Sequence, residues 1–167
     1  KNLQINFSSH QKSKPILSIF RRFSSPVLWD SDLSIDDYLF LFLNDNDYFI
    51  RWDSGQLLMR EIIKSRCEKQ ANNLLEDKLI NVIRKSINNL VNNDSFFLST
   101  LLTTPGLSEM ESYFDKVDPI NIYKKSLNFQ VSIGTKIQHD LRSSYEKILV
   151  NINELWPLGK GERKILG

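Results

Sequence analysis

Few of the residue types that usually carry catalysis or metal binding occur in this chain. It has two histidines, His10 and His139, and one cysteine, Cys67, all in unrelated segments. A zinc site needs clustered His, Cys or carboxylate ligands, and neither histidine begins a His-Glu-x-x-His pair. The sequence therefore predicts no metal-binding residue, and His139 is expected at or near the surface of a helix.

The acidic pairs and the glycine pair of the sequence fit local structure better than chemistry. Residues 36–37 (DD) and 45–47 (DND) lack the further oxygen ligands of a calcium loop, and acids are favoured at helix starts by the helix dipole. Residues 159–161 (GKG) lack the strand and spacing of a phosphate-binding loop. No serine has a histidine partner or a strand–turn–helix elbow. We therefore expect no catalytic and no cofactor-binding residue.

One short stretch, residues 47–56 (DYFIRWDSGQ), combines aromatic, basic and acidic side chains at the start of an expected helix. On a helix, Tyr48 and Phe49 lie four and three residues before Trp52 and therefore share a side with it. Asp47 precedes Arg51 by four residues, the order that favours a helical ion pair, and an arginine beside a tryptophan can stack on its ring.

Gly55 in the same stretch suggests close packing. Glycine costs a helix interior roughly 1 kcal/mol relative to alanine, so a packing reason is expected, such as the approach of a ring or a backbone. The stretch has two interpretations: an aromatic anchor that docks the helix on its neighbour, or a clamp for a ligand or substrate. The spacing favours the anchor, with Trp52 buried and Arg51 held by a nearby acid or carbonyl.

Composition indicates one ordinary globular domain with an uneven charge distribution. Of 167 residues, 41% are apolar and 25% charged, and the net charge is +2. Residues 1–29 carry five basic and no acidic residues, whereas residues 30–53 carry seven aspartates and one arginine. This contrast indicates either a basic arm for nucleic acid or two structural units with complementary surfaces where they meet. The basic residues are scattered, so we favour the second interpretation and expect no nucleic-acid partner.

The chain shows neither a membrane segment nor a secretory signal. Its longest strongly apolar run, residues 38–43 (YLFLFL), is far shorter than the roughly 20 residues of a membrane-spanning helix. A single cysteine excludes a disulfide within the chain and fits a reducing compartment. We therefore expect a cytoplasmic protein with no membrane partner.

The first 29 residues have the pattern of strands and turns. Leu3, Ile5 and Phe7 alternate with polar residues, as in a half-buried strand, and residues 16–23 and 26–29 form two further apolar stretches. Two or three strands cannot bury their own faces. We therefore expect the edge of a β domain that lies upstream.

From about residue 32 onward the pattern is helical. The expected helices are 34–43 with a Ser34/Asp37 capping box, 47–70 capped by Asp47, 75–92, 95–102 capped by Asp94, a short helix to residue 116 with a Ser108/Glu111 capping box, and a long helix from Asp118–Pro119 to about residue 148. Successive antiparallel helices with short loops predict a mainly α, solenoid-like array. No sequence repeat of fixed period accompanies it.

Three motifs in register resemble bacterial-type aminopeptidase N. Residues 21–27 (RRFSSPV) resemble its R-x-F-S-A-P-V segment, and residues 46–56 (NDYFIRWDSGQ) resemble its N-D-x-F-x-R-W-[DE]-A-x-Q motif. Residues 109–119 contain EME, FD and VDP, which resemble the segment that precedes a long helix in that family. Their order and spacing agree across about residues 15–123.

The resemblance implies a two-part fragment of a zinc metallopeptidase that removes N-terminal residues from peptides. Residues 1–31 would be the last strands of its β-sandwich domain, and residues 32–167 the first part of its C-terminal helical domain. In that family the helical domain covers the catalytic domain and helps to enclose the active-site chamber. The implied partners are therefore the absent domains of the same parent chain and, in the parent, a peptide substrate.

No catalytic or zinc residue can be carried over from the family. Its His-Glu-x-x-His helix, its distant zinc-binding glutamate and its Gly-Ala-Met-Glu-Asn loop have no counterpart here, so zinc belongs to the absent catalytic domain and this fragment is expected to be inactive alone. The residues carried over as a structural motif are Phe23, Pro26, Arg51, Trp52, Asp53, Gly55, Gln56, Asp118 and Pro119.

The sequence departs from the family at a few positions. Ser25 and Ser54 stand where the family usually has alanine, and residues 106–107 (GL) replace a usual Ser-Glu, so the helix there is expected to start at Ser108.

The alternative to an aminopeptidase fragment is a stand-alone HEAT/armadillo-like module that binds a protein partner. Both ends of the chain suggest an excised piece, and faces built for absent domains would then be exposed and favour self-association.

Overall fold

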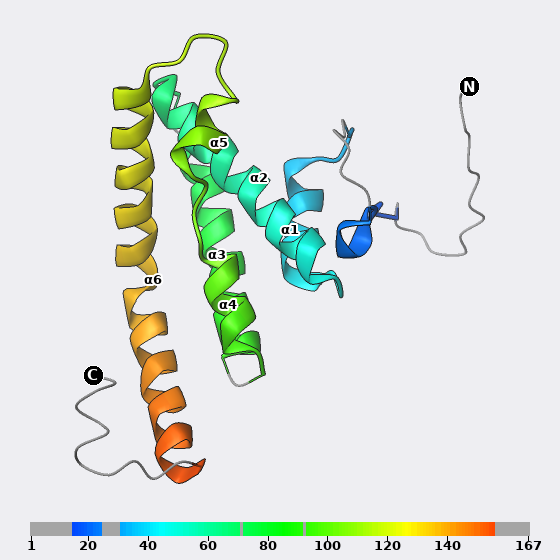
Figure 1. The fold of residues 1–167 in the computed structure, drawn as a ribbon, viewed down its shortest axis with the longest axis vertical. Coiled ribbons are helices and arrows are strands. Elements are labelled where there is room, and N and C mark those ends of the chain that lie inside the picture. The colour runs from blue at the N-terminus through cyan, green and yellow to red at the C-terminus, as the bar shows by residue number, and fades with distance from the viewer. Residues whose placement is uncertain (1–14, 25–30, 71, 92, 156–167) are drawn as a thin grey trace.

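A computed structural model describes residues 15–24, 31–70, 72–91 and 93–155 of the chain (Figure 1). Within these residues the chain forms a short 3-10 helix and six α-helices: η1 (Arg21–Phe23), α1 (Ile35–Asn44), α2 (Tyr48–Cys67), α3 (Asn73–Leu90), α4 (Ser95–Leu101), α5 (Leu107–Glu111) and α6 (Pro119–Leu155). The prediction of a mainly α fold is confirmed.

The described part of the amino-terminal segment, residues 15–24, contains no strand. Residues 15–20 are irregular and lead into η1, which lies against α2. The sequence predicted a strand-like structure for the apolar stretch at residues 16–23, and this prediction is wrong. A strand is stable only beside another strand, and here the neighbour is a helix. The stretches at 1–14 and 26–29 lie outside the described residues.

Side-chain caps set most helix starts as the sequence predicts. Ser34 and Asp37 form a reciprocal capping box at α1, with Asp37 N donating to Ser34 Oγ (3.2 Å) and Ser34 N donating to Asp37 Oδ2 (2.9 Å). Asp47 Oδ1 accepts from Ile50 N (3.1 Å) at α2, and Asp94 Oδ1 accepts from Phe97 N (2.8 Å) at α4.

The short helix α5 differs from its prediction. It begins at Leu107 and ends at Glu111, so neither the start at Ser108 nor the extension to residue 116 is correct. Glu109 Oε2 accepts from Gly106 N (2.9 Å), so the capping residue is Gly106, two residues before the Ser108 of the expected Ser108/Glu111 box. Helix α2 also ends earlier than expected, at Cys67, and α6 reaches Leu155, for a length of about 55 Å.

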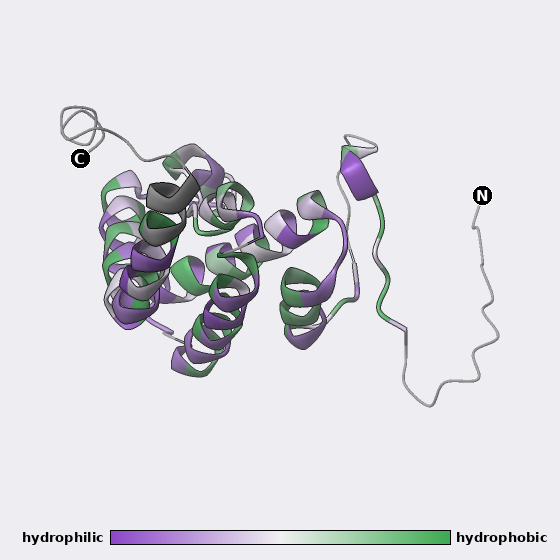
Figure 2. Cartoon of the chain, turned by 90° about the horizontal axis from the view of Figure 1, so that it is seen from below, coloured by the Kyte–Doolittle hydropathy of each residue, from purple (hydrophilic) through white to green (hydrophobic). Residues whose placement is uncertain are grey.

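The helices stack in a layered array with α6 along one edge (Figure 1). Helices α3 and α6 pack side by side and run in the same direction, because Glu76 contacts Ser132 while Arg84 contacts Asp140 further along both helices. Fully buried residues from α1, α2, α3 and α6 form one core, including Phe42, Leu58, Leu79 and Phe129. Figure 2 shows that hydrophobic and hydrophilic residues occupy different faces of the helices. No helix in the described residues has the length and apolar character needed to cross a membrane.

Candidate functional site

The corner between α1 and α2 is held by Arg51. Its side chain is buried, and its Nε donates to the carbonyl oxygen of Phe42 (2.9 Å). The expectation that an acid or carbonyl holds Arg51 is therefore confirmed, with a carbonyl as the partner. Its guanidinium lies over the ring of Phe97 (5.2 Å) rather than over Trp52. The expected Asp47–Arg51 pair does not form, because Asp47 instead caps α2 and accepts from Arg22 N (2.9 Å).

Gly55 allows α2 to approach the ring of Phe42. A Cβ atom built on Gly55 would lie 2.6 Å from Phe42 Cε2, closer than atoms in contact tolerate. Phe42 is fully buried within the core, so its ring could move only by displacing other core side chains. This confirms the expected packing reason for a glycine at this position. The next residue, Gln56, is buried and its Nε2 donates to the carbonyl of Thr103 (2.8 Å), which ties α2 to the segment after α4.

The aromatic side chains of α2 divide between two sides of the helix. Tyr48 stacks on Phe97 of α4, with ring centroids 4.1 Å apart. Phe49 lies between Phe23 (5.1 Å) and Trp52 (6.1 Å). The predicted cluster of Tyr48, Phe49 and Trp52 is therefore wrong for Tyr48, and Trp52 is partly rather than fully buried. The stacking partner of Tyr48 is 49 positions away in the sequence, so helical spacing alone could not reveal it.

The basic amino-terminal segment meets the acidic turn before α2. Arg21 forms an ion pair with Asp45 (2.7 Å), and Arg22 N donates to Asp47. Burial tends to raise the pKa of Asp45, but the hydrogen bonds that its carboxylate accepts from Arg21 and from the backbone N–H of Asp47 oppose burial, and the pKa lies below its ordinary value. The prediction of complementary surfaces where the two segments meet is confirmed.

Asp118 and Pro119 start α6 as predicted. Asp118 Oδ1 accepts from Asn121 N (3.0 Å), and Pro119 is the first helical residue. The proline needs no hydrogen-bond partner there, because the first backbone N–H groups of a helix have none within it. Pro26 lies outside the described residues, and Phe23 is largely exposed apart from its contact with Phe49.

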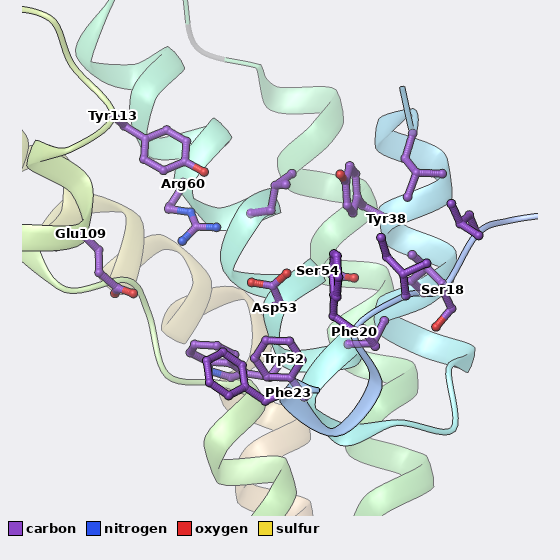
Figure 3. Close-up of a pocket in the computed structure, with 17 residues that line it drawn as sticks. Ser18, Phe20, Phe23, Tyr38, Trp52, Asp53, Ser54, Arg60, Glu109 and Tyr113 are labelled. Atoms are coloured by element: carbon purple, nitrogen blue, oxygen red, sulfur yellow. The ribbon is translucent and has the colours of Figure 1, made fainter. Parts of the chain in front are cut away.

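A pocket of about 480 Å³ opens between residues 17–23, α1, α2 and the α5 region (Figure 3). Its walls are mainly apolar, and the charged or polar side chains that line it include Ser18, Asp53, Ser54, Arg60, Glu109 and Tyr113. Trp52 and Phe23 lie together on one side of it, while Arg60 lies beside Tyr113 on the other (Figure 3). The pocket therefore combines a broad apolar wall with a small polar edge.

Asp53 and Arg60 supply the charge of this polar edge. They are two helical turns apart on α2, so they share a face. Burial raises the pKa of Asp53, and the Arg60 guanidinium offsets only part of that increase. The same guanidinium lies 4.9 Å from the centre of the Tyr113 ring. The described lining of the pocket offers carboxylates, a guanidinium cation and aromatic contacts but no activated nucleophile, so its geometry suits binding rather than covalent catalysis.

Sequence reasoning missed a second charged centre, built around Glu76. This glutamate is buried, and its carboxylate contacts Arg66 of α2 and Ser132 (2.7 Å) and Lys136 (3.3 Å) of α6. The Arg66 guanidinium also lies over the ring of Phe129. One signal in the sequence could have found it, since Glu76 lies four and seven residues before the core residues Ile80 and Ile83 and so shares their face.

The remaining candidates for chemistry are dispersed in the structure. His139 is exposed on α6, as expected. Cys67 is partly exposed at the end of α2, and burial raises the pKa of its thiol. Among the residues that the structure describes, no three His, Cys, Asp or Glu side chains gather closely enough to hold a metal ion.

The anchoring role of Trp52 predicts a measurable loss of stability. Replacing Trp52 by alanine is expected to lower the free energy of unfolding by about 1–2 kcal/mol, less than the loss for a fully buried tryptophan, because the side chain is only partly buried. Chemical denaturation followed by circular dichroism measures this change. Tyr123→Ala, at an exposed aromatic residue of α6, is the control and should leave stability nearly unchanged. An unchanged stability for Trp52→Ala would contradict the anchor.

Comparison with known proteins gives one family and a set of relatives. The family model described as "Domain of unknown function (DUF3458_C) ARM repeats" matches residues 35–165. The chain is 27% identical over 139 residues to aminopeptidase N of Caulobacter vibrioides, covering 82% of this chain and 16% of that protein. It is 26% identical over 141 residues to aminopeptidase N of Haemophilus influenzae, covering 83% and 16%. No solved structure matches the chain significantly.

These matches confirm the resemblance to aminopeptidase N. A further match, to aminopeptidase N of Escherichia coli, is 25% identical over 134 residues and covers 79% of this chain and 15% of that protein. The chain thus spans about one sixth of the length of the curated relatives it matches. The matched family region starts at residue 35, which is also the first residue of α1.

Proposed function

This chain belongs to the DUF3458_C family of ARM-repeat domains, and from that premise we propose that it forms the first part of the helical domain of an aminopeptidase N-type zinc metallopeptidase. The observation that carries the proposal is its similarity to three aminopeptidase N proteins over about four fifths of its length. In this proposal residues 1–31 close a β-sandwich domain and residues 32–167 begin the helical domain. The coincidence of the family boundary with the start of α1 supports that division.

The role proposed for the chain is structural. Its helices cover a catalytic domain that holds the zinc ion and the peptide substrate, and they form part of the wall around the active-site chamber. Arg51, Gly55 and Gln56 serve this role by fixing α2 against α1 and against the segment after α4. The chain itself contributes no zinc ligand and no catalytic group in this proposal, and the parent enzyme acts in the cytoplasm.

A stand-alone helical module that binds a protein partner is the second candidate. The family's description as ARM repeats favours it, because helical repeats commonly present extended binding surfaces. Both candidates share the same fold, and the aminopeptidase N matches favour the first. The two differ in whether the chain can replace the corresponding part of an aminopeptidase.

An exchange experiment separates the two candidates. The matched segment of the Caulobacter vibrioides aminopeptidase N is replaced by residues 32–167 of this chain, and hydrolysis of an amino-acid arylamide is measured. The first candidate predicts a folded and active chimera, because the exchanged helices rebuild the cover of the catalytic domain. The matched control is the same chimera with Gly55→Leu, which should lose activity because its α1–α2 corner cannot close. A chimera that folds and is inactive would favour the stand-alone module.

The chain alone provides the complementary measurement. Purified and washed with a chelator, it is expected to retain no stoichiometric zinc and to hydrolyse no amino-acid arylamide. Zinc content by atomic absorption and arylamide hydrolysis at high protein concentration test this expectation. Either stoichiometric zinc or hydrolysis that co-purifies with the chain would overturn its non-catalytic role.

A further inference from the structure

The pocket beside Trp52 has the size and the walls of a small-molecule site. Its described lining comes from residues 17–23 and from parts of α1, α2 and the α5 region, so it is a concavity and not a flat face (Figure 3). Its volume of about 480 Å³ lies within the roughly 300–1,000 Å³ of such sites. Phe23, Phe49 and Trp52 form an aromatic wall, with ring centroids 5.1 Å apart for the first two and 6.1 Å apart for the last two. This wall suits the apolar part of a small ligand.

The Arg60 guanidinium lines this pocket and has no hydrogen-bond acceptor among the described residues. It rests on the Tyr113 ring, 4.9 Å from the ring centre, and its Nε is buried and unpaired. Buried donors are nearly always paired in folded proteins, so an unpaired buried N–H needs an explanation. The arginine fork is well matched to a carboxylate, which it can bind at two points. Arg60 is therefore suited to bind a carboxylate of a ligand.

Asp53 supplies the opposite charge on the same helix. Its carboxylate forms neither a hydrogen bond nor a direct ion pair with any residue that the structure describes, although it lies close enough to Arg60 for the two charges to attract. The other acid of the described lining, Glu109, is already engaged, because it accepts from Gly106 N. Asp53 keeps an exposed surface, so a ligand can reach it. Asp53 is therefore suited to bind a cationic group.

Leu57 separates these two charges. It lies four residues after Asp53 and three before Arg60, so the three side chains share one face of α2. Leu57 also lines the pocket, which places an apolar surface between the carboxylate and the guanidinium. Figure 3 shows Asp53 between Trp52 and Arg60. Two opposite charges that face one pocket without pairing favour a ligand that carries both charges, since Asp53 repels a lone anion and Arg60 repels a lone cation.

We propose that this pocket binds a free amino acid with an apolar side chain. Its α-carboxylate pairs with Arg60, its α-ammonium pairs with Asp53, and its side chain lies against the aromatic wall. This binding is independent of the proposed function, because it uses only side chains of the chain itself. A small ligand with two charge pairs and limited apolar contact is expected to bind with a dissociation constant of roughly 0.1–1 mM.

Titration of the whole chain with L-leucine and its fragments, followed by nuclear magnetic resonance, tests the proposal. L-leucine is expected to bind and to shift the backbone N–H signals of residues 52–60. The fragments 4-methylpentanoate, which lacks the ammonium, and 3-methylbutylamine, which lacks the carboxylate, should each bind at least about tenfold more weakly. Glycine, which lacks the apolar side chain, should be weaker by a similar factor. No binding of L-leucine up to about 10 mM, or equal affinity for the amino acid and its fragments, would overturn the proposal.

Two substitutions assign each charge of the ligand to its partner. Asp53→Asn should weaken L-leucine binding at least about tenfold but leave 4-methylpentanoate no weaker, because that fragment has no ammonium to lose its partner. Arg60→Gln should weaken L-leucine binding by a similar factor but leave 3-methylbutylamine no weaker. The matched control is Arg142→Gln on α6, which makes the same chemical change at a side chain that is 79% exposed and does not line the pocket, and it should alter none of these affinities. If both pocket substitutions weakened all ligands alike, they would act through the fold and not through the charges of the ligand, and the assignment would be wrong.

Discussion

Replacing Glu76 by alanine is expected to lower the free energy of unfolding by about 3 kcal/mol. The buried carboxylate joins three helices through Arg66, Ser132 and Lys136. Removing it leaves the Arg66 guanidinium in a largely buried position without its acid, and an uncompensated buried charge is the main cost of breaking such a pair. Arg66 keeps 18% of its side chain exposed, which places the loss at the lower end of the range for buried pairs.

Asp77 provides the matched control for Glu76. It is the next residue along α3 and also contacts Lys136 (3.1 Å), but 65% of its side chain is exposed. Exposed ion pairs contribute little because water and salt screen them, so Asp77→Ala should change the free energy of unfolding by less than about 1 kcal/mol. Urea denaturation of both variants gives the comparison. Equal losses for the two variants would contradict a special role for the buried carboxylate.

The effect of Glu76 should also depend on pH. Burial tends to raise the pKa of Glu76, but the contacts with Ser132, Arg66 and Lys136 outweigh it and hold this pKa below its ordinary value of 4.5. The folded chain thus binds this proton less readily than the unfolded chain, so the stabilisation is complete above pH 4.5 and is lost as the pH falls through the lowered pKa. The difference in stability between the natural chain and Glu76→Gln should shrink over that range.

Local signals explain which parts of the fold were predictable. The starts of α1, α2, α4 and α6 follow from a capping side chain and the backbone N–H groups three residues later, all within one turn of sequence. The start of α5 was wrong because two acids, Glu109 and Glu111, stand at equivalent capping distance from different residues. Only the folded backbone decides that Glu109 caps Gly106.

Contacts between distant segments explain what was not predictable. Arg51 donates to the backbone carbonyl of Phe42, and a backbone carbonyl has no sequence signature. The two groups meet only because the turn at residues 45–47 folds α1 back on α2. The pocket beside Trp52 likewise needs the amino-terminal segment to dock, and the contacts Arg21–Asp45, Arg22–Asp47 and Phe23–Phe49 hold that segment in place. The motif at residues 47–56 therefore indicated where the helices meet, but not which side chains meet there.

Gly55→Leu is the second substitution with a large expected effect, a loss of about 3 kcal/mol in the free energy of unfolding. A leucine Cβ would already overlap the Phe42 ring at 2.6 Å, and overpacking a full core costs up to about this amount. The gain in helix propensity, roughly 0.8 kcal/mol, offsets only part of it. Denaturation followed by circular dichroism measures the net change.

Two comparisons identify the Phe42 ring as the cause of this loss. Combining Gly55→Leu with Phe42→Ala opens space for the new side chain, so the double variant should be more stable than the sum of the two single losses by roughly 2 kcal/mol. Gly134→Leu makes the same chemical change where nothing lies within 4 Å of the Cβ position. Gly134→Leu should therefore stabilise α6 by several tenths of a kcal/mol. If both glycine substitutions changed stability alike, helix propensity would govern them, and the contact between Gly55 and Phe42 would not be what holds α1 against α2.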